Sequence, residues 1–275
     1  MSDERLGDPV DFAEWLALRE PADAAARAPD LVERVRRQLA GRPRLIIHDL
    51  GSGTGSMGRW LAPRLPGPQH WIMYDRDADL LDRAAANMVT SAADGAPVTV
   101  ETRRRDITRL PPDELAEADL ITASALLDMF TAAEIERVVA ACAGRPTFLT
   151  LSVIGQVRLS PADPLDAEVA AAFNAHQRRT TGDRRLLGPD AVEAAIEAFG
   201  RRGVGTLVRP SPWRLGADAA GLTAEWLRGW LGAACEQRPE LAGPAAAYAD
   251  RRLAEAAAGR LGVLVGHKDL LAGCE

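Results

Sequence analysis

The sequence predicts an α/β fold: a doubly wound, mostly parallel sheet of seven strands, with N-terminal helices and a helical insertion and cap. Short apolar runs alternate with stretches of helical periodicity, and this alternation implies crossover connections between parallel strands. A glycine cluster directly follows the first apolar run, where such a fold makes a strand-to-helix turn. A length of 275 residues suits one domain of this kind.

Seven apolar runs are the predicted strands, because each is too short for a buried helix and is bounded by turn residues. The first ends in Asp49 and the glycine cluster, and the fifth is rich in Phe, Leu and Val. The predicted strands are residues 44–50, 70–75, 98–102, 118–123, 147–153, 204–208 and 261–265.

The stretches between the strands have helical periodicity and plausible start and stop signals. A break near Pro29 divides the first stretch, and Leu31, Val32, Val35 and Leu39 form the apolar stripe of its second part. Residues 155–183 are polar and predict an insertion with a short helix, and residues 210–216 predict a loop that contains Trp213. The predicted helices are residues 12–39, 56–65, 77–91, 131–143, 189–199 and 222–259.

Composition and charge exclude several function classes. The formal net charge of −6 argues against strong nonspecific affinity for nucleic acid. Residues 1–10 lack the pattern of a signal peptide, and no run of about 18 apolar residues predicts a membrane span. Cys142, Cys235 and Cys274 have neither disulfide-framework nor metal-site spacing. We therefore expect a soluble, cytoplasmic protein without a metal.

The strongest local signal is the segment Asp49-Leu50-Gly51-Ser52-Gly53-Thr54-Gly55, between a predicted strand and a predicted helix. Alternating glycines let the backbone turn sharply and approach a ligand that a Cβ would exclude. Free N–H groups at the start of the following helix add a polar cradle at the carboxyl edge of the sheet. A tight turn without a ligand is the alternative interpretation.

Two cofactor classes use such a loop. Gly53, Gly55 and Gly58 satisfy the Gly-x-Gly-x-x-Gly pattern of dinucleotide sites, which by itself is a weak signal and leaves a nicotinamide-dependent oxidoreductase open. Asp49, however, lies two residues before Gly51, where a carboxylate is unfavourable beside a pyrophosphate. S-adenosylmethionine carries an ammonium and a sulfonium and no phosphate, so the acidic loop suits it better.

Residues 49–55 resemble the first motif of class I S-adenosylmethionine-dependent methyltransferases, whose glycine loop wraps the methionine part of the cofactor. The resemblance covers residues 44–153, and the late strands near Val204 and Val263 fit the antiparallel end of that family's sheet. It implies that the cofactor is S-adenosylmethionine. The cofactor-binding residues that it implies in this loop are Asp49, Gly51, Ser52, Gly53 and Gly55.

Three later segments resemble the same family in the same order. Asp75, with Arg76 after it, occupies the place of the acid that holds the two ribose hydroxyls. Asp106-Ile107 resembles the pair in which the acid meets the adenine amine and the neighbour packs on the ring. Residues 118–127, with Ser124 and Ala125, resemble the segment that lines the sulfonium side of the pocket.

The resemblance divides a single methyltransferase domain, residues 1–275, into four parts. We expect an N-terminal helical lid at residues 1–40, a cofactor-binding core at 41–153, an insertion at 154–188, and the rest of the sheet with a helical cap (215–259) at 189–275. The insertion and cap predict an enclosed pocket and hence a small-molecule acceptor. The oligomeric state stays open.

Each assignment has a structural alternative. Asp75 could cap the next helix, although Asp77 is an equally good cap. Asp106 could simply pair with the arginines at 103–105. Arg19, Asp23 and Arg27 recur every four residues and predict a surface ion-pair ladder. The alternative for Arg19 or Arg27 is closure over the cofactor carboxylate.

The acceptor chemistry is the least determined part of the prediction. His176 and His267 are weak candidates for a general base, since neither has a sequence neighbour that would fix its tautomer. Arginines at 103–105, 178–179 and 184–185 keep an RNA or protein methyltransferase open. A cofactor-binding protein without catalysis is the alternative outside the enzymes.

Overall fold

The computed structural model describes residues 11–274. The expectation that residues 1–10 are not a signal peptide lies outside the described residues. Within them, none of the helices is long and apolar enough to cross a membrane. The same residues contain no group of three or more His, Cys, Asp or Glu side chains that could hold a metal ion, and Cys142, Cys235 and Cys274 are free thiols.

The main sheet is mixed and has the order β3-β2-β1-β4-β5-β10-β8, with β9 paired to β10 beside this path. Strands β1 to β5 are parallel, whereas β10 runs antiparallel to β5, β8 and β9. A separate two-stranded hairpin joins β6 and β7. The strands are β1 (Leu45–Leu50), β2 (Gln69–Asp75), β3 (Val98–Arg104), β4 (Leu120–Ser124), β5 (Thr147–Ser160), β6 (Thr180–Thr181), β7 (Arg184–Arg185), β8 (Thr206–Pro210), β9 (Trp213–Leu215) and β10 (Gly262–Ala272).

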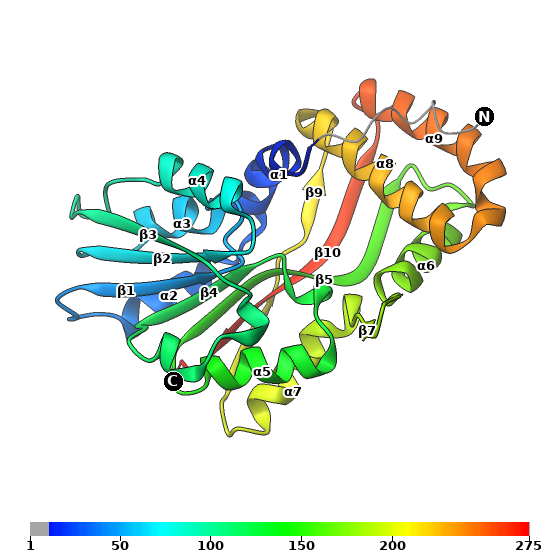
Figure 1. Cartoon of the computed structure of the whole chain (residues 1–275). Helices are drawn as coiled ribbons and strands as arrows, with labels where there is room; N and C mark the ends of the chain where they lie inside the picture. Colours follow the sequence, from blue (N-terminus) through cyan, green and yellow to red (C-terminus); the bar gives the residue numbers. More distant parts are fainter. Residues whose placement is uncertain (1–10, 275) are drawn as a thin grey trace.

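Helices cover both faces of the sheet, as the doubly wound prediction requires (Figure 1). The α-helices are α1 (Phe12–Ala26), α2 (Pro29–Gln38), α3 (Ser56–Leu61), α4 (Ala78–Asn87), α5 (Ala132–Cys142), α6 (Asp166–Gln177), α7 (Ala191–Gly200), α8 (Ala220–Gln237) and α9 (Ala242–Ala257). The 3-10 turns are η1 (Ala62–Arg64), η2 (Ile107–Arg109), η3 (Pro112–Leu115), η4 (Leu127–Met129), η5 (Gly188–Asp190), η6 (Ala217–Ala219) and η7 (Pro239–Leu241).

Two hydrophobic clusters hold this sandwich together. Residues of α2, α3 and α4 pack on one face of the sheet, and residues of α5 and α7 pack on the other. The apolar stripe predicted for the second N-terminal helix is confirmed, because all four of its members are buried. Sequence-local signals set the helix starts: Asp77 caps α4, and Thr131 with Glu134 forms a capping box at α5.

The second half of the chain departs from the prediction in the length of its strands. β5 continues to Ser160 and β10 to Ala272, so the two pair antiparallel from Ser160–Gly262 to Thr147–Ala272. The polar residues at the start of the predicted insertion are therefore strand. Val157 and Leu159 are covered, whereas Gln156, Arg158 and Ser160 are exposed. This short period-two alternation is a strand signal that the prediction of a polar insertion missed.

The far halves of β5 and β10 carry a third hydrophobic cluster, built with β9, α6, α8 and α9 (Figure 1). We call this part the cap. Trp213 lies in β9 and is buried, so the predicted loop at 210–216 is wrong there. Trp226 and Trp230 stack at 5.1 Å between ring centroids inside the same cluster, as their four-residue spacing predicts. Helix α1 lies between the cap and the glycine loop (Figure 1).

Candidate functional site

The glycine loop follows β1 at the point where the sheet order reverses between β1 and β4. Parallel sheets bind their ligands at such a switch point. Gly51 and Gly53 have φ of 65° and 53°, a region that other residues rarely adopt. A Cβ on Gly51 would lie 2.6 Å from Leu126 Cδ2, and one on Gly53 would lie 3.1 Å from Leu16 Cδ1. The loop is therefore packed between α1 and the segment after β4.

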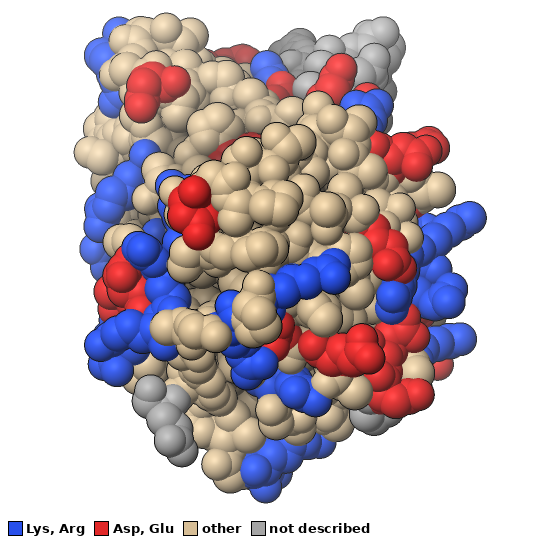
Figure 2. All heavy atoms as spheres, turned by 90° about the vertical axis from the view of Figure 1, so that its left-hand side faces the viewer, with Lys and Arg blue, Asp and Glu red and all other residues tan. Residues whose placement is uncertain are grey.

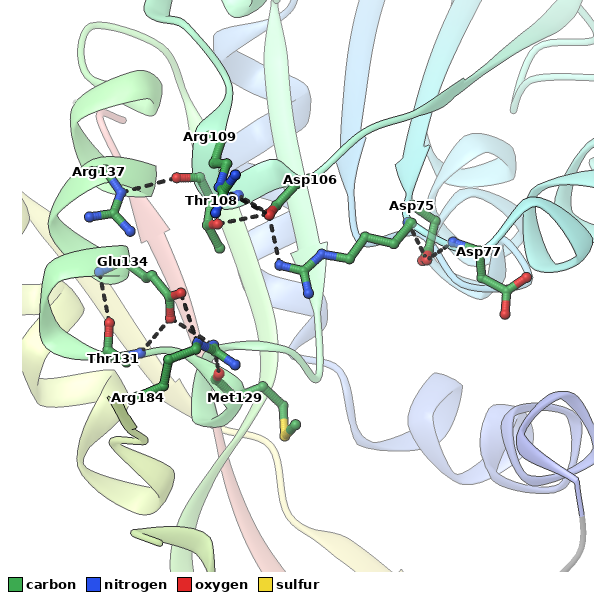
Figure 3. A network of polar contacts seen from close by, with 11 residues as sticks. Asp75, Asp77, Asp106, Thr108, Arg109, Met129, Thr131, Glu134, Arg137 and Arg184 are labelled. Carbon is green, nitrogen blue, oxygen red and sulfur yellow. Dashed lines mark hydrogen bonds and ion pairs between the residues drawn. The ribbon is translucent and has the colours of Figure 1, made fainter. Parts of the chain in front are cut away.

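Asp75 ends β2 and is joined to the glycine loop. Its Oδ2 accepts a hydrogen bond from Gly53 N at 2.9 Å, and its Oδ1 accepts from Arg76 N at 2.7 Å and Asp77 N at 3.1 Å. Figure 3 shows this turn beside Asp77, which caps α4 itself, so the capping alternative for Asp75 is wrong. Each carboxylate oxygen has two lone pairs, which leaves acceptor capacity toward a ligand.

Arg76 follows β2 and joins it to Asp106, which follows β3. Its Nη2 donates to Asp106 Oδ1 at 2.8 Å, and Thr108 donates to the same oxygen from its N at 3.0 Å and its Oγ1 at 2.7 Å. Partial burial opposes ionisation, but these hydrogen bonds lower the pKa of Asp106 to about 2. Among the described residues, Oδ2 has only Arg109 Nε, at 3.6 Å, so it can still accept a donor. Ile107 is buried next to it.

Asp49 lies in the interior, at the end of β1. Thr122 Oγ1 donates to its Oδ1 at 2.7 Å, whereas its Oδ2 has no hydrogen-bond partner among the described residues. Burial raises the pKa of Asp49 to about 6, against the effects of Thr122 and of the nearby Arg27. A buried carboxylate oxygen without a partner is destabilising unless a ligand supplies a donor or a positive charge.

Arg27 follows α1 and is 2% exposed. Its Nη2 donates to Ser124 Oγ at 3.1 Å and reaches Ser56 Oγ at 3.4 Å. Its Nε and Nη1 have no partner in the part of the chain that the structure describes. Burial lowers the pKa of Arg27, although Asp23, Asp269 and Asp49 oppose the shift. The guanidinium therefore keeps two free donors toward an anion.

The unpaired atoms of Arg27 and Asp49 can be compared with the charged groups of S-adenosylmethionine. An α-amino acid carries a carboxylate and an ammonium on one carbon, and this pair of buried charges offers a donor fork and a carboxylate oxygen. Ser52, in the same glycine loop, is a third residue with a buried polar atom, its Oγ, that has no partner in residues 11–274. A pyrophosphate would leave Asp49 uncompensated. The donor set fits the methionine end of the cofactor.

The comparison with family models agrees with this geometry. A family model described as a methyltransferase domain matches residues 47–145, which include the glycine loop, Asp75, Asp106 and Ser124. Residues 47–145 form a methyltransferase domain.

Known proteins resemble the methyltransferase only distantly. Magnesium protoporphyrin IX methyltransferase from Synechocystis PCC 6803 is 16% identical, with 75% of this chain and 84% of that chain covered and a TM-score of 0.43. A Geobacter sulfurreducens S-adenosylmethionine-dependent methyltransferase is 16% identical, with 96% and 98% covered and a TM-score of 0.43. A mycolic acid cyclopropane synthase is 12% identical, with 89% and 83% covered and a TM-score of 0.46. No curated protein matches the sequence significantly.

The structure brings most of the predicted cofactor residues of the methyltransferase to one edge of the sheet. Ser124 ends β4 and accepts from Arg27 and from Thr150 Oγ1, the latter at 3.0 Å. Ala125 has a φ of 53°, which is strained for a residue with a Cβ. This turn lets the chain leave β4 beside the glycine loop. The sequence signal for the turn is the change from apolar strand to Ser124.

The two candidate histidines belong to the second half of the methyltransferase. His176 lies in α6, where its Nε2 is 3.1 Å from Glu236 Oε2 of α8 and its Nδ1 is 3.3 Å from Arg179 Nη1. His267 lies in β10 with its Nδ1 3.0 Å from the Val265 carbonyl oxygen. Burial lowers the pKa of His267 to about 3, so this imidazole is neutral and weakly basic.

Arg27 was predicted mainly as part of a surface ladder, and that prediction is wrong. Asp23 and Arg27 are 4% and 2% exposed, and Asp23 accepts from Arg19 Nε at 3.0 Å and from Trp213 Nε1 at 2.9 Å. A four-residue charge spacing is the same on an exposed and on a buried helix face. The pairing suggested between Asp106 and residues 103–105 is also wrong, because Arg76 is its partner.

Proposed function

We propose that the chain transfers a methyl group from S-adenosylmethionine to a small-molecule acceptor. The observation that carries the cofactor assignment is the unpaired buried pair of Arg27 and Asp49 beside the glycine loop. When bound, the cofactor supplies an electrophilic methyl group on a sulfonium. The protein binds and orients it and excludes water from it, and positioning of this kind provides much of the acceleration.

Each predicted residue has a role in this proposal. Arg27, seated on Ser124, holds the carboxylate, and Asp49 faces the ammonium. Asp75 accepts the ribose hydroxyls while its hydrogen bond to Gly53 keeps the loop in register. Asp106 Oδ2 accepts the adenine amine. Gly51, Gly55, Ser52, Arg76, Ile107 and Ala125 line the same edge of the sheet.

The cap supports a small acceptor. Its cluster of α6, α8, α9 and β9 covers the far halves of β5 and β10 next to the cofactor edge (Figure 1). Residues of α1 pack against the same cluster, so an acceptor that binds beside it would meet apolar side chains. Small-molecule sites are lined largely by apolar side chains with a few polar groups.

RNA is the second candidate, on one observation. A cleft of about 730 Å³ beside the start of α5 is lined by five arginines and three acids. Several of the arginines predicted as a basic track are, however, paired with acids, and Figure 2 shows basic and acidic groups interspersed on the face it displays. The pairs are Arg103 with Glu101 and Glu114, Arg178 with Asp190, and Arg184 with Glu134. Methylation of bulk RNA that is lost at moderate salt would favour this candidate.

Calorimetric titration tests the proposed cofactor site. We expect S-adenosylmethionine and S-adenosylhomocysteine to bind and NAD not to bind. Asp75→Ala should weaken the binding of S-adenosylmethionine and of S-adenosylhomocysteine about 100-fold. The substitution removes the carboxylate that accepts the ribose hydroxyls and that anchors Gly53. Asp79→Asn, an exposed acid in the first turn of α4, is the matched control and should bind as the wild type does. Binding of NAD instead would contradict the proposal.

A further inference from the structure

The cleft beside the start of α5 contains none of the residues assigned to the cofactor. Its volume is about 730 Å³, and its walls come from η2, the first turns of α5, the residue after α6 and the segment from the β6-β7 turn to η5. Figure 3 shows three of its arginines, Arg109, Arg137 and Arg184, around the start of α5. A cavity of this size can hold a small molecule. We call it the arginine cleft.

Two of the five arginines of the cleft are neutralised by acids of the same cleft. Arg184 donates to Glu134 from its Nε at 3.1 Å and from its Nη2 at 2.8 Å. Arg178 donates to Asp190 from its Nε and its Nη2, both at 2.6 Å. Each pair uses two parallel hydrogen bonds, the geometry that a guanidinium and a carboxylate prefer. These two pairs therefore add no net charge to the cleft.

The other three arginines keep donors that no acid occupies. Arg137 donates from its Nε to the Thr108 carbonyl oxygen at 3.1 Å, and its two Nη atoms have no acceptor among the described residues. The side chain of Arg185 makes neither a hydrogen bond nor an ion pair within residues 11–274. In the same part of the chain, Arg109 meets a single acid, Asp106, at 3.6 Å.

The arginine cleft therefore has a surplus of positive charge. Against the three arginines with free donors stands one acid of the cleft, Asp183 in the turn between β6 and β7, which has no arginine partner among the described residues. The sequence has 39 acids for 33 bases, so this surplus is not a result of the overall composition. Like charges around one cavity repel one another, and an anion in the cavity relieves that repulsion.

The start of α5 adds uncharged donors to the same wall. Its capping box uses the N–H groups of Thr131 and Glu134. Ala132 and Ala133 are exposed and line the cleft, and N–H groups in the first turn of a helix have no acceptor within the helix. Phosphate oxygens accept readily from such groups. The helix start thus supplements the three arginines.

We propose that the arginine cleft binds the phosphate group of a small molecule, either inorganic phosphate or a phosphate ester. Arg109, Arg137 and Arg185 come from η2, α5 and β7, so their guanidinium groups can meet a group that presents oxygens in several directions. Guanidinium forks pair with phosphate through two hydrogen bonds, and a divalent anion matches the surplus of positive charge. The inference depends neither on the acceptor nor on the cofactor of methyl transfer.

Inorganic phosphate is titrated into the protein at fixed ionic strength, with binding followed by phosphorus NMR. Arg137→Met and Arg185→Met should each weaken the binding about tenfold, because each removes charged donors to the anion. The matched control is Arg83→Met in α4, an exposed arginine outside the cleft without an ion pair in residues 11–274, which should bind phosphate as the wild type does. A wild type that binds no phosphate, or unchanged affinity in both cleft variants, would overturn the inference.

Asp183→Asn gives an effect of opposite sign, which a damaged protein cannot imitate. It removes the negative charge that faces the anion, so phosphate should bind about two- to fivefold more tightly. Asp79→Asn, an exposed acid in the first turn of α4, is the control and should leave the affinity unchanged. Equal or weaker binding by Asp183→Asn would contradict the inference.

Arg27→Met tests whether phosphate binds at the glycine loop instead. It should bind phosphate as the wild type does, because Arg27 is not part of the arginine cleft. A loss of phosphate binding in Arg27→Met that Arg137→Met does not share would place the anion at the glycine loop and overturn the inference.

Two further probes distinguish the sources of the phosphate group. Phenyl phosphate that binds more tightly than inorganic phosphate assigns the cleft to phosphate esters, and equal or weaker binding assigns it to inorganic phosphate. A short single-stranded RNA should bind no more tightly than either. Tighter RNA binding that Arg105→Met, an exposed arginine outside the cleft, weakens as much as Arg137→Met would favour the RNA candidate and overturn the inference.

Discussion

The cofactor half and the cap of this methyltransferase place their polar groups in different ways. In the cofactor half, each group lies at or just after the carboxyl end of one of the first four strands: the glycine loop after β1, Asp75 at the end of β2, Asp106 after β3 and Ser124 at the end of β4. In the cap, the groups come from segments far apart in the chain, such as Arg179 after α6 and Trp213 in β9. A family model matches only the first half. The residues for a cofactor that a family shares therefore follow a local sequence pattern. The residues of an individual acceptor site need no such pattern.

Helix α1 contacts both halves. On the cofactor side, Leu16 covers Gly53, and Glu20 accepts from Arg59 Nε of α3 at 2.8 Å. On the cap side, Asp23 accepts from Trp213 Nε1. Asp269 of β10 then holds the residue after Arg27, because it accepts from Ala28 N at 2.8 Å. The two halves should therefore be coupled through this helix, and point substitutions test the coupling better than removal of residues 1–39, which include the buried stripe of α2.

The largest expected effect on cofactor affinity comes from Arg27, which follows α1, the helix that contacts both halves. Arg27→Met should weaken S-adenosylhomocysteine binding about 10- to 100-fold, because a hydrogen bond to a charged group contributes about 1.5 to 3 kcal/mol. Calorimetry measures it, and circular dichroism checks that the variant is folded. The control is Arg36→Met in α2, whose side chain is exposed and, within residues 11–274, pairs only with Glu33. An unchanged Kd for Arg27→Met would show that only residues of the cofactor half bind S-adenosylhomocysteine.

The second effect concerns pH and belongs to the cofactor half. Burial raises the pKa of Asp49 to about 6, so at pH 5 roughly nine in ten of these carboxyls are protonated and cannot pair with an ammonium. Affinity for S-adenosylhomocysteine should therefore rise about tenfold from pH 5 to pH 7.5. Asp49→Asn should bind more weakly and lose this dependence, whereas the control variant Asp79→Asn should retain it. A rise that survives in Asp49→Asn would place the titrating group elsewhere.

The smallest effect tests whether the cap reaches the cofactor. Trp213→Phe removes the hydrogen bond to Asp23, a contact that contributes about 1 kcal/mol, and should weaken S-adenosylhomocysteine binding by up to about fivefold. Trp226→Phe is the matched control, because Trp226 stacks on Trp230 in the same cluster and donates no hydrogen bond to α1 among the described residues. If both variants bind as the wild type does, the halves are independent.

Much of the cofactor half could be predicted because its signals are local. Each of these signals can be recognised within a few residues of sequence. They are glycines at alternate positions, an acid at the end of a strand, and an N-cap residue at the start of a helix. Asp75 and Asp106 lie where the sequence places them, and Asp77 caps α4. The cap was less predictable: the far part of β5 alternates only briefly, with apolar Val157 and Leu159 between polar residues, and Trp213 lies in a short segment between turn residues.

The sequence by itself determined the sheet, its glycine loop and the acids at its strand ends, because strand length, turn chemistry and helix caps depend on neighbours in the chain. The tertiary structure decided which face of α1 is buried, and so turned Arg27 from a surface charge into an unpaired donor beside Asp49. It also decided that Asp23 of α1 meets Trp213 of β9. A charge has the same local spacing in water and in the core, and only contacts from distant segments determine its desolvation.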